Sequence, residues 1–174
     1  PHSVVLLTNG RGAMARLRVN LGDIQSKYDC LLGANLHDRV PVDRHVFAKR
    51  VRAWLNADGF SSPLNFDNLV DFEPGPPAHW RFVANAGDGR CVELHLTADL
   101  LPDRNTIVLS FHRPNGGQRQ HELRFGCPLP DSAKVSLVLR VDLEDRNFHW
   151  ETKHGGGADY HFSANCRQTV VGPH

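Results

Sequence analysis

The sequence predicts an all-β fold, an antiparallel β-sandwich of about a dozen strands with few helices. Three observations predict it. Apolar residues recur at every second position in several segments, as in strands with one buried face. Clusters of Gly, Pro, Asn and Asp separate these segments. The 174 residues include 15 Gly and 11 Pro, which favours many turns that join short elements.

The strands are expected wherever this alternation is found. The run from Val135 to Val141, for example, alternates with Ser136 and Arg140 and is typical of a half-buried strand. Asp88-Gly89 predicts a hairpin turn between two such runs. The segment 64–72 fits a short helix and a strand equally well. In chain order, the expected strands are His2–Thr8, Ala13–Asn20, Tyr28–Leu36, His45–Asn56, Trp80–Val83, Cys91–Leu96, Ile107–Phe111, His121–Cys127, Val135–Val141, Asn147–Glu151, Asp159–Ala164 and Gln168–Val171.

Composition excludes several classes of protein. Lys+Arg 20 against Asp+Glu 19 leaves a net charge of +1, so no overall attraction to nucleic acid or to an anionic membrane is expected. Apolar stretches are far shorter than the roughly 20 residues of a spanning helix. The four cysteines form no Cys-x-x-Cys pair, and we expect buried free thiols. Residues 1–174 are interpreted as one domain, and because residue 1 is Pro, as a piece of a larger protein.

Four sequence features have plainer interpretations than the catalytic or binding ones that they suggest. Gly10 to Ala15 satisfies the Gly-x-Gly-x-x-Ala pattern of dinucleotide binding, but an alternating strand follows where a helix is required, so a glycine turn is expected. The 11 histidines show neither His-Glu-x-x-His nor i, i+4 spacing, so we expect no metal site and no cofactor. Asp142, Glu144 and Asp145 are interpreted as a solvated turn rather than glycosidase carboxylates. Trp54, Trp80 and Trp150 are interpreted as core or edge aromatics.

A series of ordered motifs resembles a known family. Val5 to Gly12 contains Thr-Asn-Gly-x-Gly and is followed by Lys27 to Leu32, and Pro41 to Phe47 follows in turn. Farther along come a Pro-containing strand at 72–82 and Asp103-Arg104-Asn105-Thr106. Between Val4 and Arg113 the chain thereby resembles the N-terminal domain of bacterial and archaeal glycogen debranching enzymes (amylo-α-1,6-glucosidases).

The resemblance implies a β-supersandwich that packs on an (α/α)6 barrel. In the family that barrel holds the acidic residues that hydrolyse α-1,6 branch linkages, so no catalytic residue is expected in this chain. The implied partners are the barrel of the parent chain and an α-glucan, with neither nucleic acid nor membrane, in the cytoplasm. Asn9, Lys27 and Tyr28 lie at motif positions with polar or aromatic character, and they are the candidate glucan-binding residues.

Two other functions stay open at this stage. The first is a free-standing β-sandwich that binds carbohydrate or protein without an enzyme partner. The second is a small β-fold enzyme that uses histidines and a metal, with ligands that converge from several strands.

Overall fold

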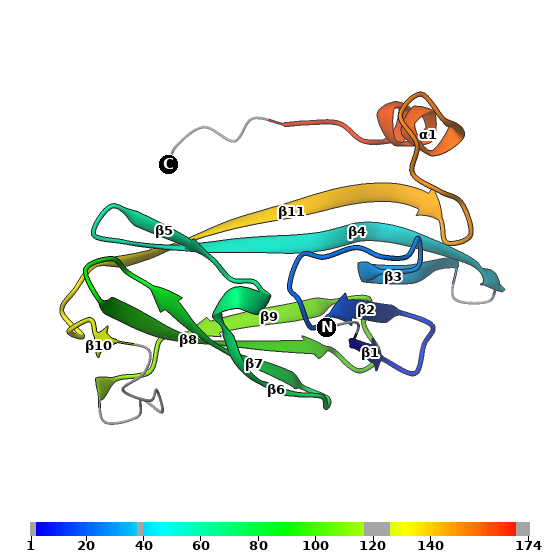
Figure 1. Ribbon diagram of the computed structural model, residues 1–174. Coiled ribbons are helices and arrows are strands. Elements are labelled where there is room, and N and C mark those ends of the chain that lie inside the picture. The colour runs from blue at the N-terminus through cyan, green and yellow to red at the C-terminus, as the bar shows by residue number, and fades with distance from the viewer. Residues whose placement is uncertain (1–2, 38–39, 117–125, 170–174) are drawn as a thin grey trace.

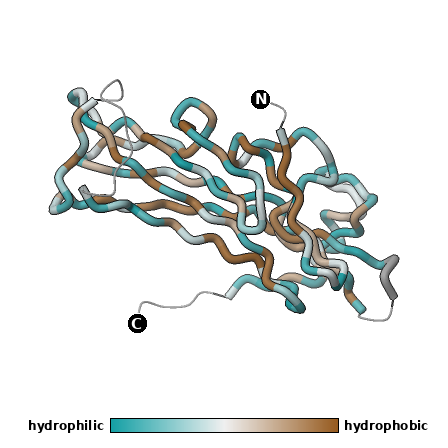
Figure 2. The backbone as a smooth tube through the Cα atoms, turned by 90° about the horizontal axis from the view of Figure 1, so that it is seen from below, coloured by the Kyte–Doolittle hydropathy of each residue, from teal (hydrophilic) through white to brown (hydrophobic). Residues whose placement is uncertain are grey.

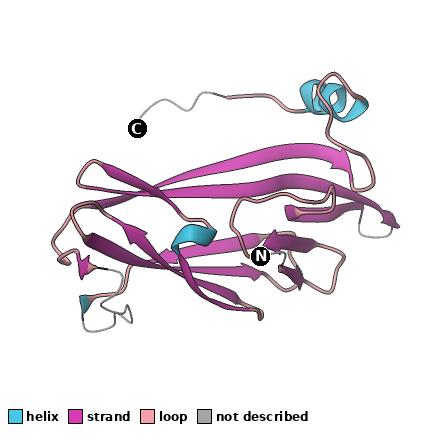
Figure 3. Cartoon of the chain, in the orientation of Figure 1, coloured by secondary structure: helices cyan, strands magenta, loops and turns pink. Residues whose placement is uncertain are grey.

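The chain forms two antiparallel sheets that pack face to face as a sandwich (Figures 1 and 3). The computed structural model describes residues 3–37, 40–116 and 126–169. One sheet has six strands and the other has five. This architecture confirms the predicted fold class.

The six-stranded sheet has the order β1-β2-β3-β4-β11, and β5 also pairs with β4. Its long central strand β4 pairs with β3, β5 and β11, while β1 and β11 lie at the two edges. The bounds are β1 Val4–Thr8, β2 Met14–Arg18, β3 Cys30–His37, β4 Val40–Ala57, β5 Phe60–Pro63 and β11 Val135–Asn147.

The turn between β1 and β2 contains Gly10 and Gly12, both with positive φ. Glycine adopts this conformation without steric cost, so the chain reverses here into an antiparallel hairpin. The Gly-x-Gly-x-x-Ala pattern is therefore a glycine turn between strands, as expected, and no helix follows it.

The five-stranded sheet has the order β10-β8-β7-β6, and β9 pairs with β8. The pairs are antiparallel except for the short parallel pair of β10 with β8. Asp88 and Gly89 both have positive φ and lie in the β7–β8 hairpin, as predicted. The bounds are β6 Leu69–Glu73, β7 Ala78–Asn85, β8 Arg90–Leu100, β9 Ile107–His112 and β10 Cys127–Pro128.

The core lies between the sheets and is formed by the apolar positions of the alternating runs. Trp80 and Phe82 on β7 and Leu55 on β4 are at most 1% exposed. The indole N–H of Trp80 donates to the carbonyl oxygen of Val19 at 3.0 Å, so this core aromatic also has its polar atom paired. Apolar segments follow the strands in Figure 2, and hydrophilic segments predominate in the turns.

Two predicted strands are wrong. Asp159–Ala164 lies within the helix α1 (Gly157–Asn165), and Asn147–Glu151 is a turn that begins as β11 ends. In α1 only Ala158 is buried, so the segment has no apolar face to bury in a sheet. Asp159 lies in the first turn of the helix and accepts a hydrogen bond from the N–H of Gly155, which stabilises a helix start.

For the residues that the structure describes, the other predictions have the following outcomes. The segment 64–72 forms both a 3-10 turn (η1, Phe66–Asn68) and β6. Gln168 and Thr169 lie outside any strand, and most of the His121–Cys127 prediction falls outside the described residues. All four cysteines are free, but only Cys30 and Cys91 are buried, so the expected burial is wrong for the other two.

None of the helices in the described part of the chain is long and apolar enough to span a membrane.

Candidate functional site

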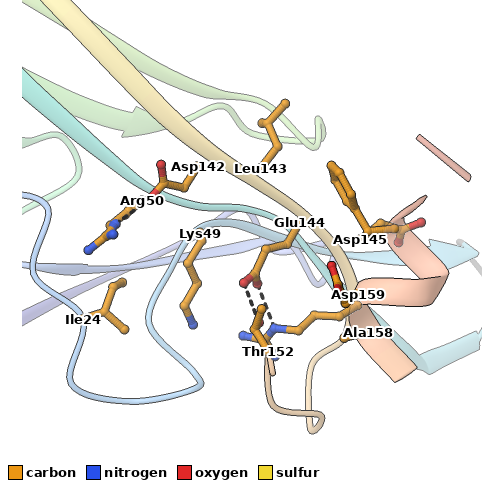
Figure 4. A pocket seen from close by; sticks show the side chains of 12 residues that line it. Ile24, Lys49, Arg50, Asp142, Leu143, Glu144, Asp145, Thr152, Ala158 and Asp159 are labelled. Carbon is orange, nitrogen blue, oxygen red and sulfur yellow. Dashed lines mark hydrogen bonds and ion pairs between the residues drawn. The ribbon is translucent and has the colours of Figure 1, made fainter. Parts of the chain in front are cut away.

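A cleft of about 460 Å³ lies between the C-terminal half of β11 and helix α1 (Figure 4). Seven of its twelve lining residues are charged, with both signs present, but apolar atoms make up most of the lining surface. β4, β11, α1 and the loop between β11 and α1 all contribute residues. The lining residues are Ile24, Lys49, Arg50, Asp142, Leu143, Glu144, Asp145, Arg146, Thr152, Ala158, Asp159 and Phe162.

A β-bulge in β11 directs its acidic residues into this cleft. Leu143 pairs with Ala48 and Arg146 pairs with Val46, so two residues of β11, Glu144 and Asp145, lie opposite the single residue Phe47 of β4. A bulge bends a strand and redirects its side chains, and bulges are frequent beside functional sites. The expectation that these carboxylates lie in a solvated turn is therefore wrong, because they belong to β11 and are half-buried.

Arg146 joins three segments at the base of the cleft. Its side chain is 1% exposed, and Nε donates to Glu144 Oε2 at 2.8 Å. Its terminal nitrogens donate to the carbonyl oxygens of Trp150 at 2.8 Å and of Lys27 at 2.6 Å. Glu144 also accepts from the Thr152 hydroxyl at 2.5 Å, and Figure 4 shows these two side chains pointing toward each other. A buried guanidinium thus ties the end of β11 to the turn before β3.

Lys49 on β4 also donates hydrogen bonds to the turn before β3. Its Nζ donates to the carbonyl oxygen of Lys27 at 2.9 Å and to that of Ser26 at 3.4 Å. Burial lowers the pKa of Lys49, and the nearby Arg146 charge lowers it further, although Glu144 acts in the opposite direction. The amine therefore gives up its proton more readily than an exposed lysine.

Two of the three predicted glucan-binding residues lie together beside this base. Lys27 Nζ donates to the carbonyl oxygen of His149 at 2.9 Å and lies 5.2 Å from the centre of the Tyr28 ring. The Tyr28 ring lies 5.0 Å from that of Phe148 and 6.0 Å from that of His149. We refer to Tyr28, Phe148 and His149 as the aromatic patch.

Asn9, the third predicted residue, lies in the β1–β2 turn and is buried. Its Oδ1 accepts from the N–H groups of Arg11 at 2.9 Å and Ala13 at 3.1 Å. Its Nδ2 donates to the carbonyl oxygen of Arg104 at 2.8 Å, in the loop between β8 and β9. The structure therefore groups Lys27 with Tyr28 and holds Asn9 in a different turn.

Two of the three tryptophans lie in different environments. Trp80 is a core residue, as expected, whereas Trp150 is 51% exposed in the loop after β11.

The sequence analysis did not single out Lys49 and Arg146 as site residues. The signal available was the mixed charge of 140–146, where Arg140 and Arg146 flank three carboxylates within an alternating segment.

A histidine cluster lies next to the cleft. His45 Nδ1 lies 2.9 Å from one oxygen of Asp145, and His161 Nε2 lies 3.0 Å from the other. These three residues come from β4, β11 and α1, and their ligand atoms all lie within 4.8 Å of one another. Their sequence separations of 100 and 16 residues match no motif.

Comparison with known protein families identifies the chain. A family model described as "Glycogen debranching enzyme N terminal" matches residues 4–173. No curated protein and no solved structure matches the chain. The family match continues past Arg113, where the recognisable motifs end, through β11 and α1. The chain belongs to the family of glycogen debranching enzyme N-terminal domains.

Proposed function

We propose that this chain is the non-catalytic sandwich domain of a glycogen debranching enzyme, a single domain of a larger parent chain. In this proposal the parent hydrolyses α-1,6 branch linkages with the acidic residues of an (α/α)6 barrel. The sandwich packs against that barrel and contacts the glucan. The family match supports the parent activity, and the resemblance to bacterial and archaeal enzymes supports a cytoplasmic location.

The exposed edge of β11 is the observation that carries the packing proposal. β11 lies at the edge of the six-stranded sheet and pairs with β4 on one side. A long apolar edge strand is an aggregation hazard unless another element covers it. Four of its apolar side chains are between 44% and 64% exposed, namely Val138, Leu139, Val141 and Leu143. We infer that the barrel of the parent chain covers this edge.

Substitution of Leu143 by Asp tests the packing proposal. In a calorimetric titration of this chain with the separately produced barrel, we expect Leu143→Asp to weaken binding by about tenfold or more, because a charge is buried at an apolar contact. Leu6→Asp is the matched control, since Leu6 is 58% exposed on β1 at the opposite edge of the sheet. An equal loss of affinity in both variants, or no association of the unmodified chain, would contradict the proposal.

The aromatic patch and the adjacent cleft support a glucan contact. Sugars are bound by aromatic rings that cover their apolar faces and by charged or polar groups that pair with hydroxyls. Tyr28 offers such a ring, and Lys27 lies beside it. A contact at Asn9 would use the second N–H of its amide, because the first donates to Arg104.

A titration with a maltooligosaccharide tests the glucan contact. We expect NMR signals of Lys27 and Tyr28 to shift, and we expect Tyr28→Ala to weaken binding by about 2–10-fold through loss of ring contact. Tyr160→Ala is the control, because Tyr160 is the other tyrosine, is 70% exposed and lies on α1. The glucan contact is wrong if millimolar sugar leaves the Lys27 and Tyr28 signals unchanged.

A further inference from the structure

We propose that His45, Asp145 and His161 form a binding site for a divalent transition metal ion of the Zn²⁺ class. The site is distinct from the aromatic patch and does not depend on the proposed function. The three side chains come from β4, β11 and α1, respectively, and their ligand atoms all lie within 4.8 Å of one another.

The carboxylate of Asp145 lies between the two imidazoles. Its Oδ1 is 2.9 Å from His45 Nδ1, and its Oδ2 is 3.0 Å from His161 Nε2. Zinc binds nitrogen and carboxylate oxygen at about 2.0–2.2 Å, which places tetrahedral ligand atoms about 3.4 Å apart. Shifts of about half an ångström therefore make room for an ion between the carboxylate and one imidazole. The other imidazole nitrogen starts within 4.8 Å and has to approach to about 3.4 Å to complete the ligand set.

The donor set determines the class of ion. Two imidazole nitrogens with one carboxylate oxygen suit Zn²⁺, Co²⁺ and Ni²⁺, whereas Mg²⁺ and Ca²⁺ prefer oxygen ligands alone. Three protein ligands leave the fourth tetrahedral position for water or an external ligand. The side chains of His45 and Asp145 are 14% and 19% exposed, and that of His161 is 40% exposed, so an ion reaches the site from the helix side.

Asn165 lies beside one of the ligands. Its amide nitrogen lies 3.3 Å from His161 Nδ1 and donates to the His161 carbonyl oxygen at 2.8 Å. When Nε2 ligates a metal, Nδ1 carries the proton and faces the Asn165 amide nitrogen, which is also a donor, so the Asn165 side chain turns away and leaves Nδ1 to water. An acceptor at this nitrogen, here water, is the usual way in which a ligating histidine is held in the correct tautomer.

Metal binding would join α1 to the sheet. The helix has nine residues, of which only Ala158 is buried. The contact of His161 with Asp145 links it to β11, where the bulge turns Asp145 toward His45. An ion held by all three ligands therefore restrains the helix more strongly than one hydrogen bond does.

A zinc titration of the chelator-treated chain tests the site. We expect saturable calorimetric binding of one equivalent of Zn²⁺. His161→Ala and Asp145→Asn should each weaken it by about 100-fold or more, since loss of an outer contact alone costs about 10–100-fold. His154→Ala is the matched control, because His154 is exposed in the loop that leads to α1 and lies outside the cluster.

Hydrogen exchange gives a second readout that a purely structural role of His161 would not produce. Zinc should slow amide exchange in residues 157–165 of the unmodified chain and of His154→Ala, but not of His161→Ala. Since His161 lies on a surface helix, its variant should keep the sandwich, which circular dichroism checks. The proposal is overturned if zinc does not bind saturably, or if neither His161→Ala nor Asp145→Asn changes its affinity.

Discussion

Replacement of Arg146 by Met is expected to lower the free energy of unfolding by about 3–5 kcal/mol, the usual cost of removing one partner of a buried ion pair. The guanidinium is 1% exposed and bonds to the Glu144 carboxylate. It also donates to the carbonyl oxygens of Lys27 and Trp150. Met fills a similar volume but donates no hydrogen bond, so the carboxylate and both carbonyl groups lose their buried donor.

Urea denaturation measures the effect, and Arg140→Met is the control. Arg140 lies on the same strand and pairs with Asp142, but its side chain is 66% exposed. Exposed pairs contribute about 0–1 kcal/mol, so this variant should remain close to the unmodified protein. Similar losses in both variants would show that burial of Arg146 does not determine its contribution.

Replacement of Asp29 by Asn is expected to cost about 3 kcal/mol at neutral pH. The carboxylate is 1% exposed and pairs with the guanidinium groups of Arg16 and Arg18. It also accepts from the backbone N–H groups of Gln25 and Ser26 at 2.8 and 2.9 Å. An amide has one acceptor oxygen and no charge, so the substituted side chain cannot satisfy all of these donors.

The stability provided by Asp29 should depend on pH in a defined direction. Burial raises the pKa of Asp29, but the hydrogen bonds from Gln25 and Arg18 and the charges of Arg16 and Arg18 outweigh it and hold the pKa below its usual range. A depressed pKa in the folded state stabilises the fold above the unfolded-state pKa of about 3.9 and ceases to do so as pH falls through the folded value. The difference between the unmodified protein and Asp29→Asn should therefore shrink in acid.

Denaturation at neutral pH and again below about pH 3 measures this difference. Asp142→Asn is the matched control, because Asp142 also pairs with arginines, namely Arg50, Arg52 and Arg140, but is 24% exposed. We expect it to cost about 1 kcal/mol or less. The interpretation of Asp29 fails if the cost of Asp29→Asn is the same at both pH values.

The strands could be predicted because the apolar alternation that identifies each of them lies within a short segment of the chain. β4, β7, β8, β9 and β11 all contain the apolar alternation that predicted them. The Asp88-Gly89 hairpin followed from the ease with which these residues adopt positive φ. In contrast, α1 was mistaken for a strand because the few residues around Tyr160 carry little periodic signal of either kind.

The candidate site was predictable only in part. Lys27 and Tyr28 are adjacent in sequence, so their grouping required no knowledge of the fold. Their neighbours Arg146 and Phe148 come from the end of β11 and from the turn after it, about 120 residues later, and the register of β11 on β4 places them there. Asn9 belongs to another motif of the same ordered series and lies in another turn, since motif order along a chain does not specify distance in space.

The sequence by itself determined the fold class and the family, because both depend on patterns within a few residues and on the order of short motifs. The tertiary structure decided which charges are buried and which side chains meet. A single β-bulge between Leu143 and Arg146 directs Glu144 into the cleft and Asp145 toward His45. Such a bulge depends on the pairing of two strands about 90 residues apart, and no local pattern encodes that pairing.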